Sequence, residues 1–118
     1  MRDHRKLKAF EHADALIVAV YCETKAFPRE ETFGLTAQIR RVAVSVAANV
    51  VEGCAREGKN EYVNFLNIAF GSLREVGYYV DLSRRLGYLS DKSAGELKGR
   101  YEECARILSG LIKSLRSA

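Results

Sequence analysis

The stretch from residue 34 to residue 56 constrains the fold more than any other part of this chain. It reads GLTAQIRRVAVSVAANVVEGCAR, a run rich in alanine and valine with polar residues at spacings of three and four. Such spacing is the period of an α-helix. At about 100° per residue, the polar side chains fall within an arc of about 80°. This polar stripe comprises Gln38, Arg41, Ser45, Asn49, Glu52 and Arg56.

Apolar residues fill the two other arcs of the same helix. The first arc continues a spacing of three and four and is expected to pack inside a bundle; it comprises Leu35, Ile39, Val42, Val46, Val50 and Gly53. The second, here called the outer arc, comprises Ala37, Val44, Ala47, Ala48, Val51 and Ala55. Apolar surface left in water usually marks an interface. We therefore expect self-association, with Val44, Ala48, Val51 and Ala55 in the oligomer interface.

The polar stripe allows two interpretations. In the first it is structural: Arg41, Glu52 and Arg56 satisfy one another in a partly buried network, and Ser45 and Asn49 complete the hydrogen bonds. In the second, the arginines and Asn49 face a groove and bind a phosphate or carboxylate, to which the guanidinium fork is suited. The sequence leaves both open.

Three further helices are predicted from the same periodicity. The first runs from Lys8 to about Lys25 and ends before the Phe27-Pro28 pair. The third begins near Asn60 as a cap and stops at Gly87, and the fourth has Ser90 as its cap. Their apolar positions are Phe10, Ala13, Ile17 and Val20; Tyr62, Leu66, Ala69, Leu73, Val76 and Val80; and Leu97, Tyr101, Cys104, Leu108, Leu111 and Leu115.

The predicted fold class is all-α. With 118 residues, 47% hydrophobic residues and a single proline, the chain fits one domain spanning residues 1–118, with residues 1–8 as a mobile basic tail. Four helices with short connections indicate an antiparallel up-and-down four-helix bundle. The outer arc extends this prediction to a ring-shaped homo-oligomer.

Positive charge is concentrated at the two ends of the sequence. Residues 1–8 hold four Lys/Arg and one acid, and residues 82–118 hold eight Lys/Arg and four acids. Basic clusters can neutralise phosphates and release counterions, so RNA or DNA is a possible partner. Glu102, between Lys98 and Arg106 at i,i+4 spacing, weakens this reading. The predicted nucleic-acid-binding residues are Arg5, Lys6, Lys8, Lys98, Arg106 and Lys113.

Other functional classes find little support in the sequence. His4 and His12 have no visible nucleophilic partner, and adjacent acids on a helix diverge too far to share a metal. The three cysteines are widely spaced, so neither a zinc site nor a disulfide framework is indicated. There is no phosphate-binding glycine loop, no run long enough to span a membrane and no signal-like apolar segment. We expect a cytoplasmic protein with no catalytic residue, cofactor or small-molecule substrate.

Two segments resemble a known family. FPREETFGLTAQIRRVAVSVAANVVEGCAR, followed by EYVNFLNIAFGSLREV, is similar to the central helices of the bacterial four-helix bundle family that includes proteins encoded in intervening sequences of large-subunit ribosomal RNA. The likeness extends over nearly the whole chain. Ala47 stands where the family often has proline, so we expect a straighter second helix here.

The resemblance implies a ring-shaped homopentamer with a basic surface that binds nucleic acid, and no established catalytic residue. The chain also resembles the accessory protein of diversity-generating retroelements, which implies a role beside a reverse transcriptase. Two functional hypotheses follow. The first is an oligomeric nucleic-acid-binding protein. The second is an oligomeric scaffold for another protein, in which the charges serve solubility and local pairing.

Overall fold

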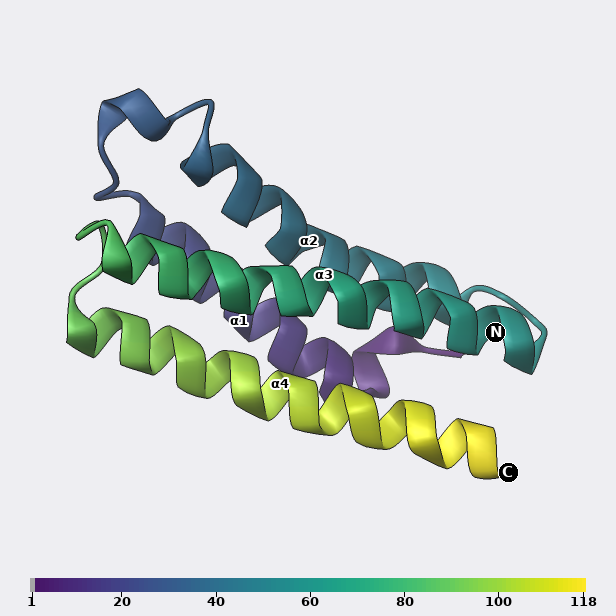
Figure 1. Cartoon of the computed structure of the whole chain (residues 1–118). Helices are drawn as coiled ribbons and strands as arrows, with labels where there is room; N and C mark the ends of the chain where they lie inside the picture. The colour runs from purple at the N-terminus through teal and green to yellow at the C-terminus, as the bar shows by residue number, and fades with distance from the viewer. Residues whose placement is uncertain (1) are drawn as a thin grey trace.

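The computed structural model describes residues 2–118, which form four long helices and no strand. Figure 1 shows them side by side, each running against its neighbour, with the two chain ends at the same end of the bundle. This confirms the predicted all-helical bundle. The helices are α1 (Lys8–Thr24), α2 (Leu35–Cys54), α3 (Lys59–Arg85) and α4 (Asp91–Ser117), with short 3₁₀ turns η1 (His4–Lys6) and η2 (Arg29–Glu31).

The end of α3 and the start of α4 lie at residues that cap helices, but one predicted cap is wrong. The Ser90 side chain accepts a hydrogen bond of 3.0 Å from the Ser93 N–H, so the predicted cap of α4 is confirmed. Gly87, at φ 80°, ends α3 in the left-handed region that favours glycine. The predicted cap at Asn60 is wrong, because Gly58 is the N-cap and α3 already begins at Lys59. An extended glycine suffices here to start the helix without a side-chain cap.

One hydrophobic core runs the length of the bundle. Each helix contributes fully buried side chains, and α2 packs against α1 and α3 while α4 closes the ring of four between α3 and α1. The largest buried residues include Leu16, Ile39, Leu66, Leu73, Leu97 and Leu108. The apolar positions predicted for α2 and α3 are all buried in this core, as their period requires. In α1 and α4, five predicted positions are partly buried and pack against the core: Phe10, Ile17, Tyr101, Leu111 and Leu115.

Close approaches between helices occur at glycine. A Cβ placed on Gly53 of α2 would lie 3.0 Å from the Phe65 Cβ and 3.3 Å from the Tyr62 carbonyl oxygen on α3. On α3, a Cβ at Gly77 would lie 2.6 Å from the Tyr101 ring of α4. Both glycines therefore set how near neighbouring helices come.

Residues 2–7, which we expected to belong to a mobile tail, lie against the bundle. The Arg2 N–H donates to the Cys54 carbonyl at 3.1 Å, and its guanidinium lies 4.0 Å from the centre of the Tyr62 ring. Asp3 caps η1 by accepting from the Arg5 N–H at 3.0 Å. The basic start of the chain is thus placed beside the junction of α2 and α3. Within residues 2–118, no helix is long and apolar enough to cross a membrane.

Candidate functional site

The polar stripe of α2 does not form one network. Arg41 donates two hydrogen bonds, of 3.1 and 2.9 Å, to the Gln38 side-chain oxygen, and both residues are exposed. The predicted pairing of Arg41 with Glu52 is wrong. Eleven residues separate them, which corresponds to about 16 Å along a helix and exceeds the reach of an ion pair. A shared angular position on a helix does not bring side chains together when they lie three turns apart.

The middle of the stripe links α2 to α3. The Ser45 and Ser72 hydroxyls are 2.9 Å apart, and the Asn49 amide donates to the Ser45 carbonyl at 2.8 Å and to its hydroxyl at 3.0 Å. All three side chains are partly buried. These contacts join α2 to α3, but none of them links Ser45 or Asn49 to Arg41, Glu52 or Arg56, with which the structural interpretation had grouped them.

The end of the stripe is an exposed ion pair. Arg56 pairs with Glu52 one turn before it, and the two side chains are 41% and 49% exposed. The Arg56 guanidinium also lies 5.1 Å from the centre of the Phe65 ring. Arg41 is about 20 Å from the C-terminal end of α2 at the rise of a helix, and Arg56 lies beyond that end, so the two guanidinium groups do not converge on one small anion.

The outer arc of α2 faces solvent along most of its length. Val44 is 41% exposed and Val51 is 36% exposed, and Ala37, Ala48 and Ala55 are exposed as well. Ala47 differs from the others, because it is 7% exposed at the flank of α2. The residues predicted to form an oligomer interface are therefore accessible on the protomer.

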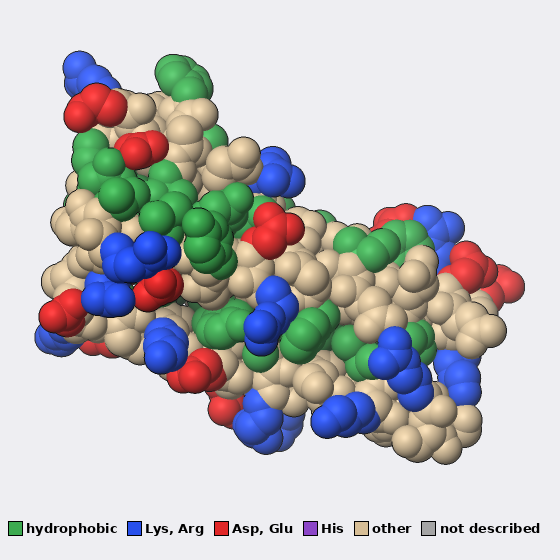
Figure 2. Space-filling view, viewed as in Figure 1, with side chains coloured by type: hydrophobic (Ala, Val, Ile, Leu, Met, Phe, Trp, Pro, Cys, Tyr) green, Lys and Arg blue, Asp and Glu red, His purple; other side chains and the backbone are tan. Residues whose placement is uncertain are grey.

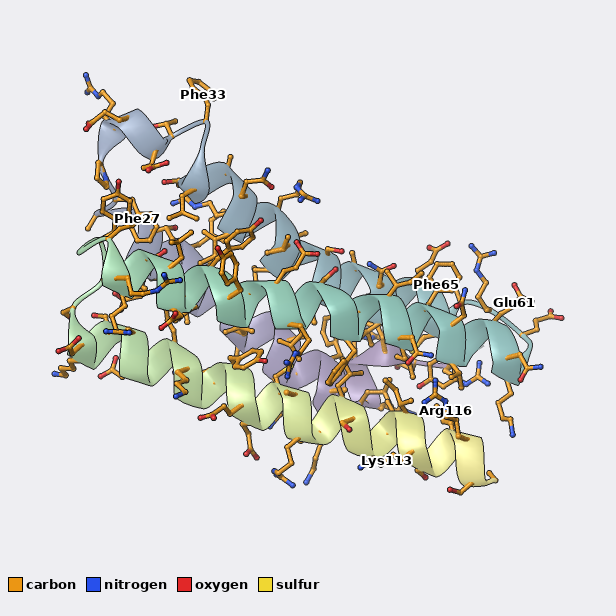
Figure 3. All side chains as sticks on the ribbon, in the orientation of Figure 1. Phe27, Phe33, Glu61, Phe65, Lys113 and Arg116 are labelled. Atoms are coloured by element: carbon orange, nitrogen blue, oxygen red, sulfur yellow. The ribbon has the colours of Figure 1, made fainter. Side chains whose placement is uncertain are left out.

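The structure brings the two basic ends of the sequence to one end of the bundle. The Arg2 guanidinium donates to the Arg56 carbonyl at 2.8 Å, and Lys59, at the start of α3, donates to the Ala118 carbonyl at 2.9 Å. Figure 3 shows Lys113 and Arg116 on the last turns of α4 at this same end. In Figure 2, Lys and Arg side chains line this part of α4 with few acids among them.

The six predicted nucleic-acid-binding residues are all exposed but differ in their partners. Arg5 pairs with Asp3 at 3.0 Å, and Arg106 pairs with Glu103 at 2.6 Å. Arg106 therefore uses the acid three residues before it and not Glu102. Among residues 2–118, no ion pair involves Lys6, Lys8, Lys98 or Lys113. We refer to Lys6, Lys8 and Lys113, with Arg116, as the basic end.

Lys98 lies apart from the basic end. It is about 22 Å from Lys113 along α4, and it lines a groove of about 590 Å³ between α3 and α4. Small and apolar residues form its floor, and charged residues form its rim. The groove is lined by Gly77, Val80, Asp81, Arg84, Asp91, Ala94, Gly95, Lys98 and Tyr101.

Exposed aromatic and aliphatic side chains at the opposite end were not predicted from the sequence. Phe33, between η2 and α2, is 97% exposed, while Tyr78 is 57% and Leu86 is 50% exposed. Figure 2 shows hydrophobic atoms gathered where α3 ends and α2 begins, and Figure 3 shows Phe33 standing away from the bundle. Helical periodicity could not identify Phe33, because it belongs to no helix.

Two titratable groups in the core have raised pKa values. Burial raises the pKa of the Tyr62 hydroxyl to about 12 and that of the Cys104 thiol to about 11, so both stay protonated near neutral pH. The His4 ring packs edge-on against Phe10, with centroids 4.7 Å apart. No cluster of His, Cys, Asp and Glu within residues 2–118 could hold a metal ion.

Comparison with known proteins agrees with this architecture. The structure of a protein of unknown function from the S23 ribosomal protein family of Bacteroides thetaiotaomicron has a TM-score of 0.81 to this chain and is 23% identical to it. The likeness covers 89% of this chain and 98% of that one, and at this identity it shows the shared fold alone. No curated protein matches the chain. The family model described as 23S rRNA-intervening sequence protein matches residues 5–110. This chain therefore belongs to the family of 23S rRNA-intervening sequence proteins.

Proposed function

We propose that this protein is a non-enzymatic, ring-shaped homo-oligomer that binds RNA or DNA through phosphate contacts at its basic end. The observation that carries the proposal is that residues 2–8 and the last turns of α4 lie at the same end of the bundle (Figure 1), so cations that are distant in sequence share one end of the molecule. Lys6, Lys8 and Lys113 have no acidic partner among the described residues, so their charge is available to a phosphate. Such contacts position a nucleic acid without reading its bases.

Self-association would multiply this surface. A protomer with a formal net charge of +4 offers few phosphate contacts, but a ring repeats the basic end in every copy, so weak contacts add through effective concentration. The exposed outer arc of α2 supports association, and five copies is the number that the family resemblance implies. Val44→Glu or Val51→Glu should split the oligomer and leave the protomer helical, which sedimentation and circular dichroism would check.

A titration with labelled single-stranded RNA and duplex DNA tests the binding. We expect micromolar or tighter binding at about 50 mM salt, little sequence selectivity, and a steep loss by about 200 mM salt because counterions are released. The double variant Lys8→Gln with Lys113→Gln should weaken binding to both. Its control, Lys25→Gln with Lys92→Gln, removes the same charge from exposed positions at the other end of the bundle and should bind normally.

A protein-scaffold role is the second candidate, and the exposed side chains of Ile68, Tyr78 and Leu86 favour it. Ile68 and Tyr78 lie on α3 and Leu86 lies just after it, so they belong to a different element from the outer arc of α2. A reverse transcriptase is one partner that the resemblance implies. If the wild-type oligomer binds neither nucleic acid at low salt, the proposal of nucleic-acid binding fails and this second role replaces it.

A further inference from the structure

Phe33 is the most exposed large hydrophobic side chain of the described residues, at 97%. Hydrogen bonds hold the chain on both sides of it. The Thr32 hydroxyl donates to the Arg29 carbonyl at 2.7 Å, and the Glu31 carboxylate accepts from the Leu35 N–H at 2.9 Å. An aromatic ring presented to water on an anchored turn is typical of a residue that is buried in a partner.

The groove between α3 and α4 is suited to receive such a ring. Its floor includes Val80 and Ala94, which are 3% and 5% exposed, and the Tyr101 ring that packs on Gly77. A Cβ at Gly95 would meet no atom within 4 Å, so the groove is open there. Its volume of about 590 Å³ leaves room for an aromatic side chain and part of the segment beside it.

Charges beside Phe33 complement charges on the rim of the groove. Arg29 and Glu30 are exposed near Phe33, while Asp91 and Lys98 are exposed on the rim, and no ion pair within residues 2–118 involves these four side chains. Arg84 on the rim already shares Asp81 with Arg85. One acid and one base therefore stand on each side of the contact, so ion pairs of opposite charge can accompany a docked Phe33.

The positions of Phe33 and the groove favour a closed ring. The helices follow one another around the bundle, so Phe33 lies at the edge formed by α1 and α2, whereas the groove opens at the edge formed by α3 and α4. Both features lie at the end where α1 and α3 finish (Figure 3). Head-to-tail contacts between two different patches close a ring when successive copies are related by rotation with no rise.

We propose that Phe33 of one copy docks in the α3–α4 groove of the next copy, an inference that rests on the self-association proposed above. The occupant is a second copy of this chain, and each copy supplies one ring and one groove. The outer arc of α2 begins a few residues after Phe33, so it extends the same contact along the bundle.

Two variants test the two halves of the contact. Phe33→Ala removes the ring, and Gly95→Phe fills the groove in a position where the protomer has open space. Each should weaken self-association about tenfold or more, because a buried aromatic anchor dominates such contacts. The matched controls are Leu86→Ala, which removes another exposed hydrophobic residue, and Gly110→Phe, which adds a ring to α4 at an open position about four turns beyond Gly95 and outside the groove lining. Both controls should sediment like the wild type, and circular dichroism should show equal helicity throughout.

Mixing the two dissociated variants gives the decisive measurement. A Gly95→Phe chain still carries Phe33, and a Phe33→Ala chain still has an open groove, so a mixture of the two can form one contact. At a protein concentration where each variant alone sediments as a monomer, the mixture should sediment as a heterodimer. The docking inference is overturned if the mixture forms no dimer, or if either variant alone forms the same oligomer as the wild type. Either result would leave the proposed self-association of the wild type standing. A wild-type chain that is monomeric at micromolar concentration overturns the proposed self-association and this contact together.

Discussion

The Tyr88 hydroxyl donates a hydrogen bond of 2.9 Å to the Glu31 carboxylate across 57 positions of sequence. The other carboxylate oxygen accepts the Leu35 N–H at 2.9 Å, and Tyr88 also packs near the Phe27 ring, with centroids 5.5 Å apart. Glu31 thus joins the turn before α2 to the turn before α4. This contact fixes the segment that presents Phe33.

Stability at acid pH should depend on Glu31. The Leu35 N–H first, and the Tyr88 hydroxyl second, lower the pKa of the Glu31 carboxyl from its ordinary value of 4.5. Because the pKa of Glu31 is lower in the folded protein, its carboxylate stabilises the fold fully above about pH 4.5, the ordinary pKa of the group. This stabilisation is lost as the pH falls through the pKa of Glu31 in the folded protein. Glu31→Gln should therefore lower the unfolding midpoint in urea at neutral pH, with a smaller difference at about pH 3. The control is Glu30→Gln, an exposed neighbour; equal midpoints for both variants at neutral pH would contradict the assignment.

Removing Glu52 should have a small effect on folding. Its pair with Arg56 is exposed, and exposed pairs contribute under about 1 kcal/mol to the free energy of unfolding. Glu52→Ala should therefore lose less than that in chemical denaturation. A loss of about 3 kcal/mol would indicate a buried charge left without its partner, against the geometry described here.

Two glycine-to-alanine changes should have opposite signs. At Gly53 the new methyl group would press on the α3 backbone at Tyr62 and on Phe65, which costs about 1–3 kcal/mol as overpacking. At Gly99 it would meet no atom within 4 Å, so the higher helix propensity of alanine should add up to about 1 kcal/mol. Thermal or urea unfolding of both variants measures the difference. Equal stability of the two would show that α2 and α3 can separate at Gly53 without cost.

The three thiols should react unequally with a thiol reagent in the native protein. Cys54 and Cys104 are buried, and desolvation raises the pKa of both thiols, that of Cys104 to about 11. Cys22 is exposed. At about pH 8 only Cys22 should react quickly, because the thiolate is the nucleophile. In denaturant all three should react; fast reaction of more than one thiol in the folded protein would show that the core opens readily.

Local sequence chemistry was enough to predict the helices and the two sides of α2. Leu66, Leu73 and Val80 recur at the helical period and lie in the core, and Ser90 caps α4 as its position before an apolar run indicates. The exposure of Val44 and Val51 follows from the same geometry. Periodicity succeeds here because a helix fixes the direction of each side chain from its residue number alone.

Tertiary structure decided which distant groups meet. The Arg2 contact with Cys54, the Glu31 bond to Tyr88 and the placing of Lys98 in a groove all depend on how chain segments return to one another. Even within α2, the sequence showed that Arg41 and Glu52 share one side but not that Gln38 and Arg56 are their respective partners. A period specifies an angle about a helix axis, whereas contacts require proximity in three dimensions, which only the packing of the four helices supplies.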